Sequence, residues 1–231
     1  GMAEERSNQM STINTINMTP LTAAGSPELF QRRNFINVEQ NSEEWLALRL
    51  GRFTASNAAD LFAKKSTKAY QDLIKRVAFE RIKGKSPDDF EYKGGYLQRG
   101  HDLEPLAAEA YQQHTGELLL NGGFFTLGDW IGASPDGRHI DGVSGVEIKC
   151  LGWKAFMDYA KLPTLAPEYY WQVHFQMLVT GWESVEFFAW NTDFDIIPPV
   201  TVKRDEAVVE QLQNAIREAV YEVERWIDVL Q

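Results

Sequence analysis

The chain has 231 residues, of which 44% are hydrophobic, and it carries a formal net charge of -10. This length and composition are typical of one globular domain with a sizeable core. The single cysteine, Cys150, excludes an internal disulfide framework and a cysteine-based zinc or iron-sulfur site within one chain, and it indicates a reducing compartment. No apolar run approaches the about 18 residues of a membrane span, and the N-terminus lacks a signal-peptide pattern, so we expect a cytoplasmic protein without a membrane segment.

The beginning of the chain differs in composition from the rest. Its first 34 residues are rich in Ser, Thr, Asn, Met and Gln and have no sustained hydrophobic period. Such a composition favours a flexible arm, because it offers little apolar surface to bury. We therefore expect residues 1–34 to form an arm and residues 35–231 to form a single domain.

Charge is unevenly distributed along the chain. The acidic net charge by itself argues against a nucleic-acid partner, since phosphate contacts need Lys and Arg. Between Arg49 and Lys85, however, there are ten basic and three acidic residues, which gives +7 for this stretch and leaves -17 for the remainder. This stretch is either a solvated helix surface or a surface that follows DNA, and a phosphate-processing site elsewhere in the chain favours the second interpretation.

A short helix is predicted where the folded domain begins. Asn41 and Glu44 have the spacing of a capping pair that opens a helix, and Gly51 is placed to close it. Arg49 then lies in the last turn of this helix.

Two further helices are predicted within the basic stretch. Thr54 or Ser56 is placed to cap a helix that continues to Phe62, and the start of that helix offers N–H groups to an anion. Hydrophobic residues at helical spacing predict another helix from Lys68 to Lys83.

The remaining periodicities predict a mixture of helices and strands. Helices are expected at Tyr96–His114, Lys154–Lys161, Tyr169–Thr180 and Asp205–Leu230, and strands at Leu118–Gly128, Trp130–Ala133 and Glu183–Trp190. This order favours an α/β (α+β) domain with a mixed central β-sheet flanked by helices. The long acidic C-terminal helix is expected to pack on the domain or on another subunit.

A β-hairpin is predicted for the stretch from Trp130 to Cys150, with its turn at the Asp-Gly dipeptide at positions 141 and 142. A two-residue turn at this dipeptide sets Asp136 opposite Glu147. A loop two residues longer sets Asp136 opposite Lys149 instead. Sequence alone leaves both registers open.

Either register gathers the charged side chains of the hairpin on one face. Side chains alternate along a strand, so Glu147 and Lys149 project together while Val146, Ile148 and Cys150 project into a core. The alternative is a surface hairpin with a solvated pair of charges.

Two carboxylates across a hairpin repel each other, which a bound cation would relieve. Carboxylate oxygens and waters suit Mg²⁺, with Mn²⁺ as a second choice. The Lys149 ammonium beside the metal would orient or activate a water and stabilise charge that develops on a phosphate. Removing either carboxylate should relieve the repulsion in the metal-free protein.

These residues carry a resemblance. Asp136 within Ser-Pro-Asp-Gly, followed by Glu-Ile-Lys-Cys at 147–150, resembles the PD-(D/E)-x-K nuclease motif in the form found in lambda-type exonucleases and YqaJ-like viral recombinases. Three further blocks follow the family's order, namely WLALRLGRFTAS at 45–56, RGHDLEPLA at 99–107 and YYWQVHFQM at 169–177. The resemblance covers roughly residues 40–205 and implies a restriction-endonuclease-like core.

The resemblance implies roles for individual residues of a metal-dependent nuclease site. It implies metal ligands at Asp136, Glu147, Glu104 and the backbone carbonyl of Ile148, and catalytic roles for Asp136, Glu147, Glu104, Lys149 and Gln172. In this scheme Lys149 serves the attacking water, and Gln172 binds that water or the scissile phosphate. Without the resemblance, a helical Glu or Gln is more often a surface residue.

The resemblance also implies a phosphate site in the first block. Arg49 and Ser56 match the family positions that hold the 5'-terminal phosphate of DNA, and Thr54 and Arg52 beside them are further candidates for phosphate or DNA binding. Their local setting independently suits an anion, because Arg can hold two phosphate oxygens and a helix start adds N–H groups. In the alternative interpretation Arg49 pairs with a nearby acid and Ser56 only caps its helix.

Taken together, the resemblance implies a Mg²⁺-dependent exonuclease that degrades double-stranded DNA from its ends in the 5'-to-3' direction. It further implies a ring of three subunits that serves phage-type recombination in a bacterial host, with a single-strand annealing protein as partner. Two alternatives remain open, which are another PD-(D/E)-x-K enzyme such as an endonuclease or junction resolvase, and a DNA-binding recombination module without nuclease activity. The intact Asp136, Glu147 and Lys149 argue against the last.

Overall fold

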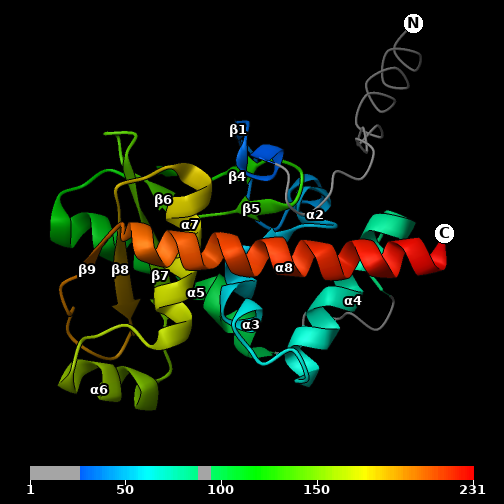
Figure 1. The fold of residues 1–231 in the computed structure, drawn as a ribbon. Helices are drawn as coiled ribbons and strands as arrows, with labels where there is room; N and C mark the ends of the chain where they lie inside the picture. The colour runs from blue at the N-terminus through cyan, green and yellow to red at the C-terminus, as the bar shows by residue number, and fades with distance from the viewer. Residues whose placement is uncertain (1–26, 88–94) are drawn as a thin grey trace, which may run out of the picture.

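Two mixed β-sheets form the framework of the protein, and helices pack against them (Figure 1). The computed structural model describes residues 27–87 and 95–231. The four-stranded sheet contains, in spatial order, β1 (Arg33–Ile36), β4 (Phe124–Leu127), β5 (Ile131–Ala133) and β2 (Phe53–Thr54). The five-stranded sheet contains β3 (Leu120–Asn121), β6 (Gly137–Arg138), β7 (Ser144–Cys150), β8 (Ser184–Trp190) and β9 (Val200–Lys203). The predicted α/β class is confirmed, but the predicted central sheet is divided into two.

The helices agree with the hydrophobic periodicity of the sequence. They are η1 (Pro27–Phe30), α2 (Glu43–Arg49), η2 (Ala55–Asn57), α3 (Ala58–Leu61), α4 (Lys68–Lys83), α5 (Gly95–Thr115), α6 (Trp153–Lys161), α7 (Pro167–Thr180) and α8 (Glu206–Leu230). Each predicted helix from residue 68 onward is confirmed to within two residues. No helix formed by the described residues has the length and apolar character needed to cross a membrane.

Helix α7 joins the two sheets. It contacts β4 and β5 of the four-stranded sheet and β8 of the five-stranded sheet. Its last eight residues, Val173–Thr180, are all buried, and Gly181 ends the helix with a φ of 77° that favours glycine. Side chains that α7 directs toward β7 are therefore held in a rigid setting.

The long C-terminal helix α8 covers the helical side of this core. It contacts α4, α7 and α3 and runs across the molecule in Figure 1. Leu212, Ile216, Val220 and Val223 are fully buried along its inner face. Packing of this helix on its own domain, one of the two predicted arrangements, is thus confirmed.

The start of the folded domain lies earlier than predicted. Residues 1–26 of the predicted arm fall outside the described residues, whereas residues 27–34 belong to the fold. Leu29 is only 6% exposed within the main core, and Arg33 donates a hydrogen bond from Nε to the Val179 carbonyl at 2.6 Å. These contacts come from residues far along the chain, so local composition gave no sign of them.

Helix α2 is capped by a different residue from the predicted one. The Ser42 hydroxyl accepts a hydrogen bond from the Trp45 N–H at 3.2 Å, while Asn41 lies outside the helix with a φ of 66°. Thr54, by contrast, precedes η2 as predicted, and the Asn57 side chain accepts from its backbone N–H at 3.4 Å.

The hairpin adopts the first of the two predicted registers. β6 pairs with β7 so that Gly137 faces Val146, and one step further along this register Asp136 comes opposite Glu147. The turn is wider than two residues, because the Asp141 carboxylate accepts N–H groups from both Val143 and Ser144. The hairpin itself spans only residues 137–150. Residues 130–133, predicted as part of it, instead include β5 of the other sheet, which pairs with β4 and β2.

Candidate active site

The β6–β7 hairpin brings three predicted site residues together. Glu147 and Lys149 lie on the same face of β7, with the Lys149 Nζ 2.6 Å from Glu147 Oε1. Asp136 lies immediately before β6, and its Oδ2 accepts the backbone N–H of Ile148 at 2.6 Å. The opposite face of β7 directs Val146 and Ile148 into a core, as predicted. The charged face is therefore fixed by both strand pairing and packing.

The Glu147 carboxylate is buried under helix α7. It is 3% exposed, and it accepts hydrogen bonds from Gln172 Nε2 at 2.7 Å and Gln176 Nε2 at 2.5 Å. The i, i+4 spacing predicts that both glutamines lie on one face of α7, and the family resemblance indicated a role only for Gln172. The structure adds Gln176, because each glutamine holds one oxygen of the same carboxylate.

Asp136 occupies an electrostatically unfavourable position. Burial, followed by the charges of Glu147 and Glu104, raises the pKa of Asp136 well above its ordinary value, and Lys149 and the Ile148 N–H oppose this shift. Glu104, which lies on α5, is thus near enough to interact with the hairpin carboxylates. The three predicted acidic residues therefore interact electrostatically, although they come from α5, the residue before β6 and the middle of β7.

Lys149 is held in its charged form by its neighbours. Burial lowers the pKa of Lys149, but the Glu147 and Asp136 carboxylates outweigh burial and leave the pKa raised. The side chain is 24% exposed, and its Nζ lies 5.2 Å from the centre of the Tyr169 ring. An ammonium at the edge of this site can stabilise negative charge on a bound group, but it is not a ready proton acceptor.

A polar network links α5 to the five-stranded sheet. The Tyr111 hydroxyl donates to Glu186 of β8, and the same hydroxyl lies 2.8 Å from His139 Nε2. His139 Nδ1 in turn lies 2.8 Å from Ser144 Oγ at the start of β7. Tyr111 follows Glu104 by seven residues, so the two side chains lie on the same side of α5. This network, which no sequence motif indicated, fixes the helix that carries Glu104.

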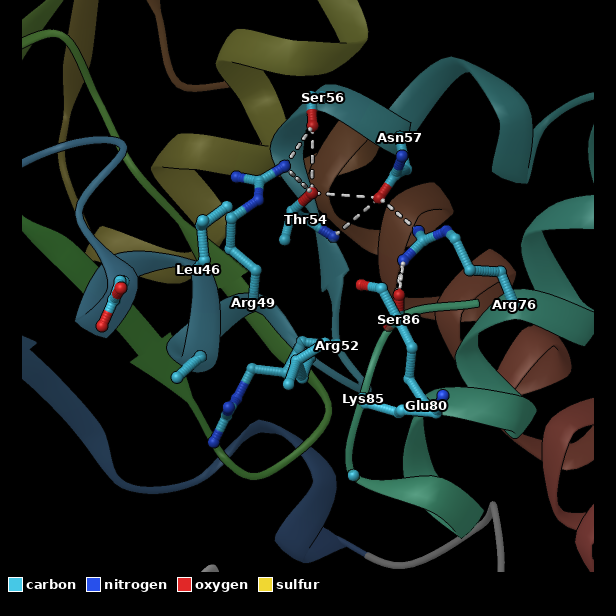
Figure 2. Close-up of a pocket in the computed structure, with 14 residues that line it drawn as sticks. Leu46, Arg49, Arg52, Thr54, Ser56, Asn57, Arg76, Glu80, Lys85 and Ser86 are labelled. Carbon is cyan, nitrogen blue, oxygen red and sulfur yellow. Dashed lines mark hydrogen bonds and ion pairs between the residues drawn. The ribbon is translucent and has the colours of Figure 1, made fainter. Parts of the chain in front are cut away.

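A separate cavity of about 630 Å³ brings together three of the predicted phosphate-binding residues (Figure 2). Arg49 Nη2 donates to Thr54 Oγ1 at 3.3 Å and to Ser56 Oγ at 3.1 Å, and the two hydroxyls lie 3.0 Å apart. The Arg49 guanidinium also lies 4.4 Å from the centre of the Trp45 ring. One cation and two hydroxyls therefore converge at the end of α2 and the start of η2.

Arg52 is not part of this convergence. Its guanidinium donates to the Leu48 carbonyl at 2.7 Å and points away from the hydroxyls in Figure 2. Burial lowers the pKa of Arg52, which the charge of Asp129 partly offsets. Arg52 lines the cavity, but its guanidinium binds the backbone of α2 and is directed away from Thr54 and Ser56.

Other basic residues of the 49–85 stretch are also engaged within the protein. Arg76 pairs with Glu80, Lys65 with Glu218, and Lys68 with Asp72. Arg81 stacks on Trp130, and burial lowers its pKa to about 10. The local excess of positive charge thus serves internal contacts as well as the cavity.

Comparison with known proteins assigns the chain to a family. Residues 44–183, more than half of the 231 residues, match the model of the YqaJ-like viral recombinase domain. The chain belongs to this family. No curated protein sequence matches it significantly.

Solved structures resemble this YqaJ-like domain over most of its length. An alkaline exonuclease from Laribacter hongkongensis is 28% identical with a TM-score of 0.73, and the match covers 82% of this chain and 96% of that chain. The same exonuclease in complex with dAMP is 29% identical with a TM-score of 0.74, with the same coverage. A phage-related exonuclease from Haemophilus somnus 129PT, 15% identical with a TM-score of 0.56 over 80% of this chain and 98% of that chain, shares the fold.

The hairpin site of this YqaJ-like domain suits a divalent cation by its chemistry. Glu147 and Glu104 are close enough to raise the pKa of Asp136, and a hard cation held by Asp136 and Glu104 would remove that repulsion. Among the residues that the structure describes, no three or more His, Cys, Asp and Glu side chains are already gathered at metal-binding distances. Glu147 already accepts hydrogen bonds from Lys149 and two glutamines, so a metal would share this carboxylate with those donors.

The two hairpin carboxylates should have opposite effects on the stability of the metal-free protein. The structure restricts the expected relief of repulsion to Asp136, because the Glu147 carboxylate already accepts three hydrogen bonds. In EDTA, Asp136→Asn should raise the free energy of unfolding, because it removes a buried charge that lies near the Glu147 and Glu104 carboxylates. Glu147→Ala should lower it by about 3 kcal/mol or more, since Lys149 loses its nearest carboxylate. Urea denaturation measures both, and shifts of the same sign would contradict this electrostatic account.

Proposed function

We propose that this YqaJ-like domain is a Mg²⁺-dependent DNA exonuclease of phage-type recombination that degrades double-stranded DNA from its 5' ends. The observation that carries the proposal is the convergence of Asp136, Glu147 and Lys149 on one hairpin, beside Glu104 of α5. Similarity to an alkaline exonuclease along 96% of that protein supports the same activity. The host cell of such an enzyme would be bacterial.

Each residue has a task that follows from its position. Mg²⁺, or Mn²⁺ in its place, would supply electrophilic activation of the scissile phosphate and its attacking water. Asp136, Glu147 and Glu104, with the Ile148 carbonyl, would hold the ion. Lys149, which stays protonated, would stabilise charge on the phosphate and orient the water. Gln172 and Gln176 keep the Glu147 carboxylate in one orientation.

The preference for 5' ends is proposed from the second site. Arg49, Thr54 and Ser56 provide a guanidinium and two hydroxyls, which are groups that bind a terminal phosphate. A phosphate bound at this cavity would hold the end of the DNA while the hairpin site hydrolyses the strand. Arg49 contacts phosphate in this proposal, whereas Arg52 does not.

Loss of any member of the hairpin site should abolish most of the activity. Asp136→Ala, Glu147→Ala and Lys149→Ala should each lower the rate of cleavage of linear duplex DNA in Mg²⁺ by about 100-fold or more, because charge stabilisation and water activation act together. EDTA should have the same effect on the wild type. The measurement is release of nucleotides from end-labelled linear duplex.

Two controls separate this proposal from its alternatives. Lys149→Ala should still bind DNA in EDTA, because the ammonium is proposed to act on the reacting phosphate. Covalently closed circular duplex should resist the wild-type enzyme, whereas an endonuclease or junction resolvase would not need an end. Retained cleavage in two of the three alanine variants would disprove the site assignment, and a wild type without nuclease activity would favour a DNA-binding module.

The phosphate cavity predicts a substrate preference. Wild type should degrade 5'-phosphorylated duplex faster than 5'-hydroxyl duplex, and Arg49→Ala should reduce that preference by about 10-fold or more, the effect of losing a charge-assisted hydrogen bond. Arg225→Ala, at an exposed arginine of α8, is the matched control and should keep the preference. If Arg49→Ala keeps the full preference in a folded protein, the cavity does not read the DNA end.

We further propose that three subunits form a ring around DNA and that a single-strand annealing protein is the partner, as the lambda-type family resemblance implies. Sedimentation at micromolar concentration should give about three times the 26.3 kDa mass of the chain. A monomer under these conditions would contradict the ring.

A further inference from the structure

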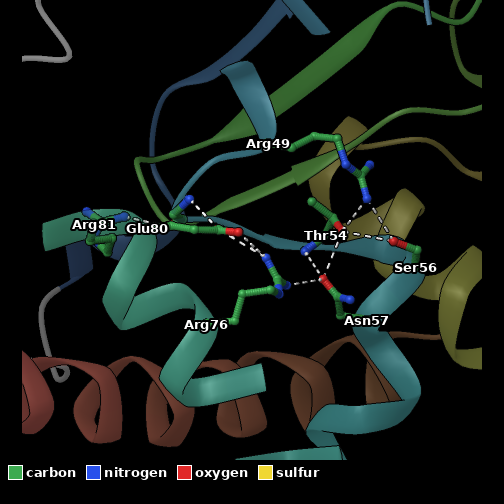
Figure 3. A network of polar contacts seen from close by, with 8 residues as sticks. Arg49, Thr54, Ser56, Asn57, Arg76, Glu80 and Arg81 are labelled. Carbon is green, nitrogen blue, oxygen red and sulfur yellow. Dashed lines mark hydrogen bonds and ion pairs between the residues drawn. The ribbon is translucent and has the colours of Figure 1, made fainter. Parts of the chain in front are cut away.

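A buried ion pair on α4 supports the phosphate cavity from behind (Figure 3). Glu80 is only 3% exposed, and Arg76 Nη1 donates to both of its oxygens at 2.9 and 3.0 Å. Glu80 Oε2 also accepts the backbone N–H of Gly51 at 2.9 Å. Glu80 on α4 is therefore bonded to Gly51, which follows Arg49, the last residue of α2, by two positions.

The other end of the same pair reaches the hydroxyls of the cavity. Arg76 Nη2 donates to Asn57 Oδ1 at 3.3 Å, and Thr54 donates to the same oxygen from Oγ1 at 3.0 Å. Thr54 Oγ1 then contacts Ser56 and accepts from Arg49. Figure 3 displays this unbroken chain from Glu80 on α4 to the Arg49 guanidinium.

Gly51 is held tightly at the junction between α2 and α4. Arg81 Nη1 donates to its carbonyl at 2.7 Å, while Glu80 accepts its N–H. Its φ is 68°, and a Cβ at this position would lie 2.7 Å from the Arg81 Cγ. The Gly51 backbone is therefore held against α4 by its close approach to Arg81 and by two hydrogen bonds. We infer that the position of Arg49, two residues earlier, depends on α4.

We propose that Glu80 and Arg76 are positioning residues for the 5'-terminal phosphate, which fix the Arg49 guanidinium relative to the Thr54 and Ser56 hydroxyls and so determine the discrimination between phosphate and hydroxyl ends. This inference rests on the proposed binding of a 5'-phosphate in the cavity. Glu80 and Arg76 need not touch the phosphate. Side chains that are already fixed bind the phosphate without losing the conformational entropy that mobile side chains would lose. A buried ion pair adds little net stability, so specificity of position is its better explanation here.

The decisive variant is Glu80→Gln. Glutamine has nearly the same shape but one acceptor oxygen, so its NH₂ group must face the Arg76 donor in either orientation, and in one of them the Gly51 N–H as well. The ratio of the degradation rates on 5'-phosphorylated and 5'-hydroxyl duplex should fall by about 10-fold, the effect of one weakened charge-assisted hydrogen bond. Single-turnover assays on the two ends measure this ratio.

A second variant of the ion pair and a control variant show whether the effect is specific to Glu80 and Arg76. Arg76→Lys keeps a positive charge beside Glu80, but its single ammonium lacks the fork that spans Glu80 and Asn57, so the ratio should fall in this variant too. Asp72→Asn makes the same change of charge as Glu80→Gln on the same helix, at an exposed pair with Lys68, and should keep the wild-type ratio. Thermal unfolding identifies the variants that are folded.

The outcomes distinguish the inference from the function on which it rests. A lowered ratio in folded Glu80→Gln and Arg76→Lys supports the positioning role. A wild-type ratio that both variants keep, or rates on the two ends that fall together at constant ratio, overturns it and leaves the phosphate cavity intact. If the wild type itself has a ratio of one, the 5'-phosphate proposal fails and the positioning role fails with it.

Discussion

The buried carboxylate of Glu147 is the constraint on which the arrangement of this protein depends. A charged group that is 3% exposed needs partners for both oxygens, and it obtains them from Lys149 on its own strand and from two glutamines of α7. Because α7 contacts both sheets, these bonds tie the hairpin to the centre of the molecule. The site is thereby built on a strand and a buried helix, which position side chains more accurately than a loop would.

The second support of the hairpin comes from its other face. Tyr111 connects α5 to β8 through Glu186 and to the hairpin turn through His139. Burial and the hydrogen bond to Glu186 raise the pKa of Tyr111, so this hydroxyl remains protonated and continues to donate. Strand β7 is thus held by glutamines on one face and by α5 on the other.

Helix α7 packs against the elements that form the cavity and also carries residues of the hairpin site. The Trp171 ring stacks on Phe62 at the end of α3, with ring centres 3.9 Å apart, and Trp171 is the neighbour of Gln172. Helix α7 also contacts η2, which carries Ser56. A rigid path of packed elements therefore connects the residues proposed to hold a DNA end with those proposed to cleave it.

Sequence by itself determined the features that depend on local pattern. The periodicity of α4, α7 and α8 and the grouping of Asp136, Glu147 and Lys149 follow from alternation, helical spacing and turn residues, which act over a few positions. Only the tertiary structure decided which of the two hairpin registers forms, the division into two sheets, the inclusion of residues 27–34 in the fold, and the contacts of Gln176, Tyr111 and Glu80. Those features depend on contacts between residues far apart in the chain, such as Arg33 with Val179 and Glu80 with Gly51, for which no local spacing gives a signal.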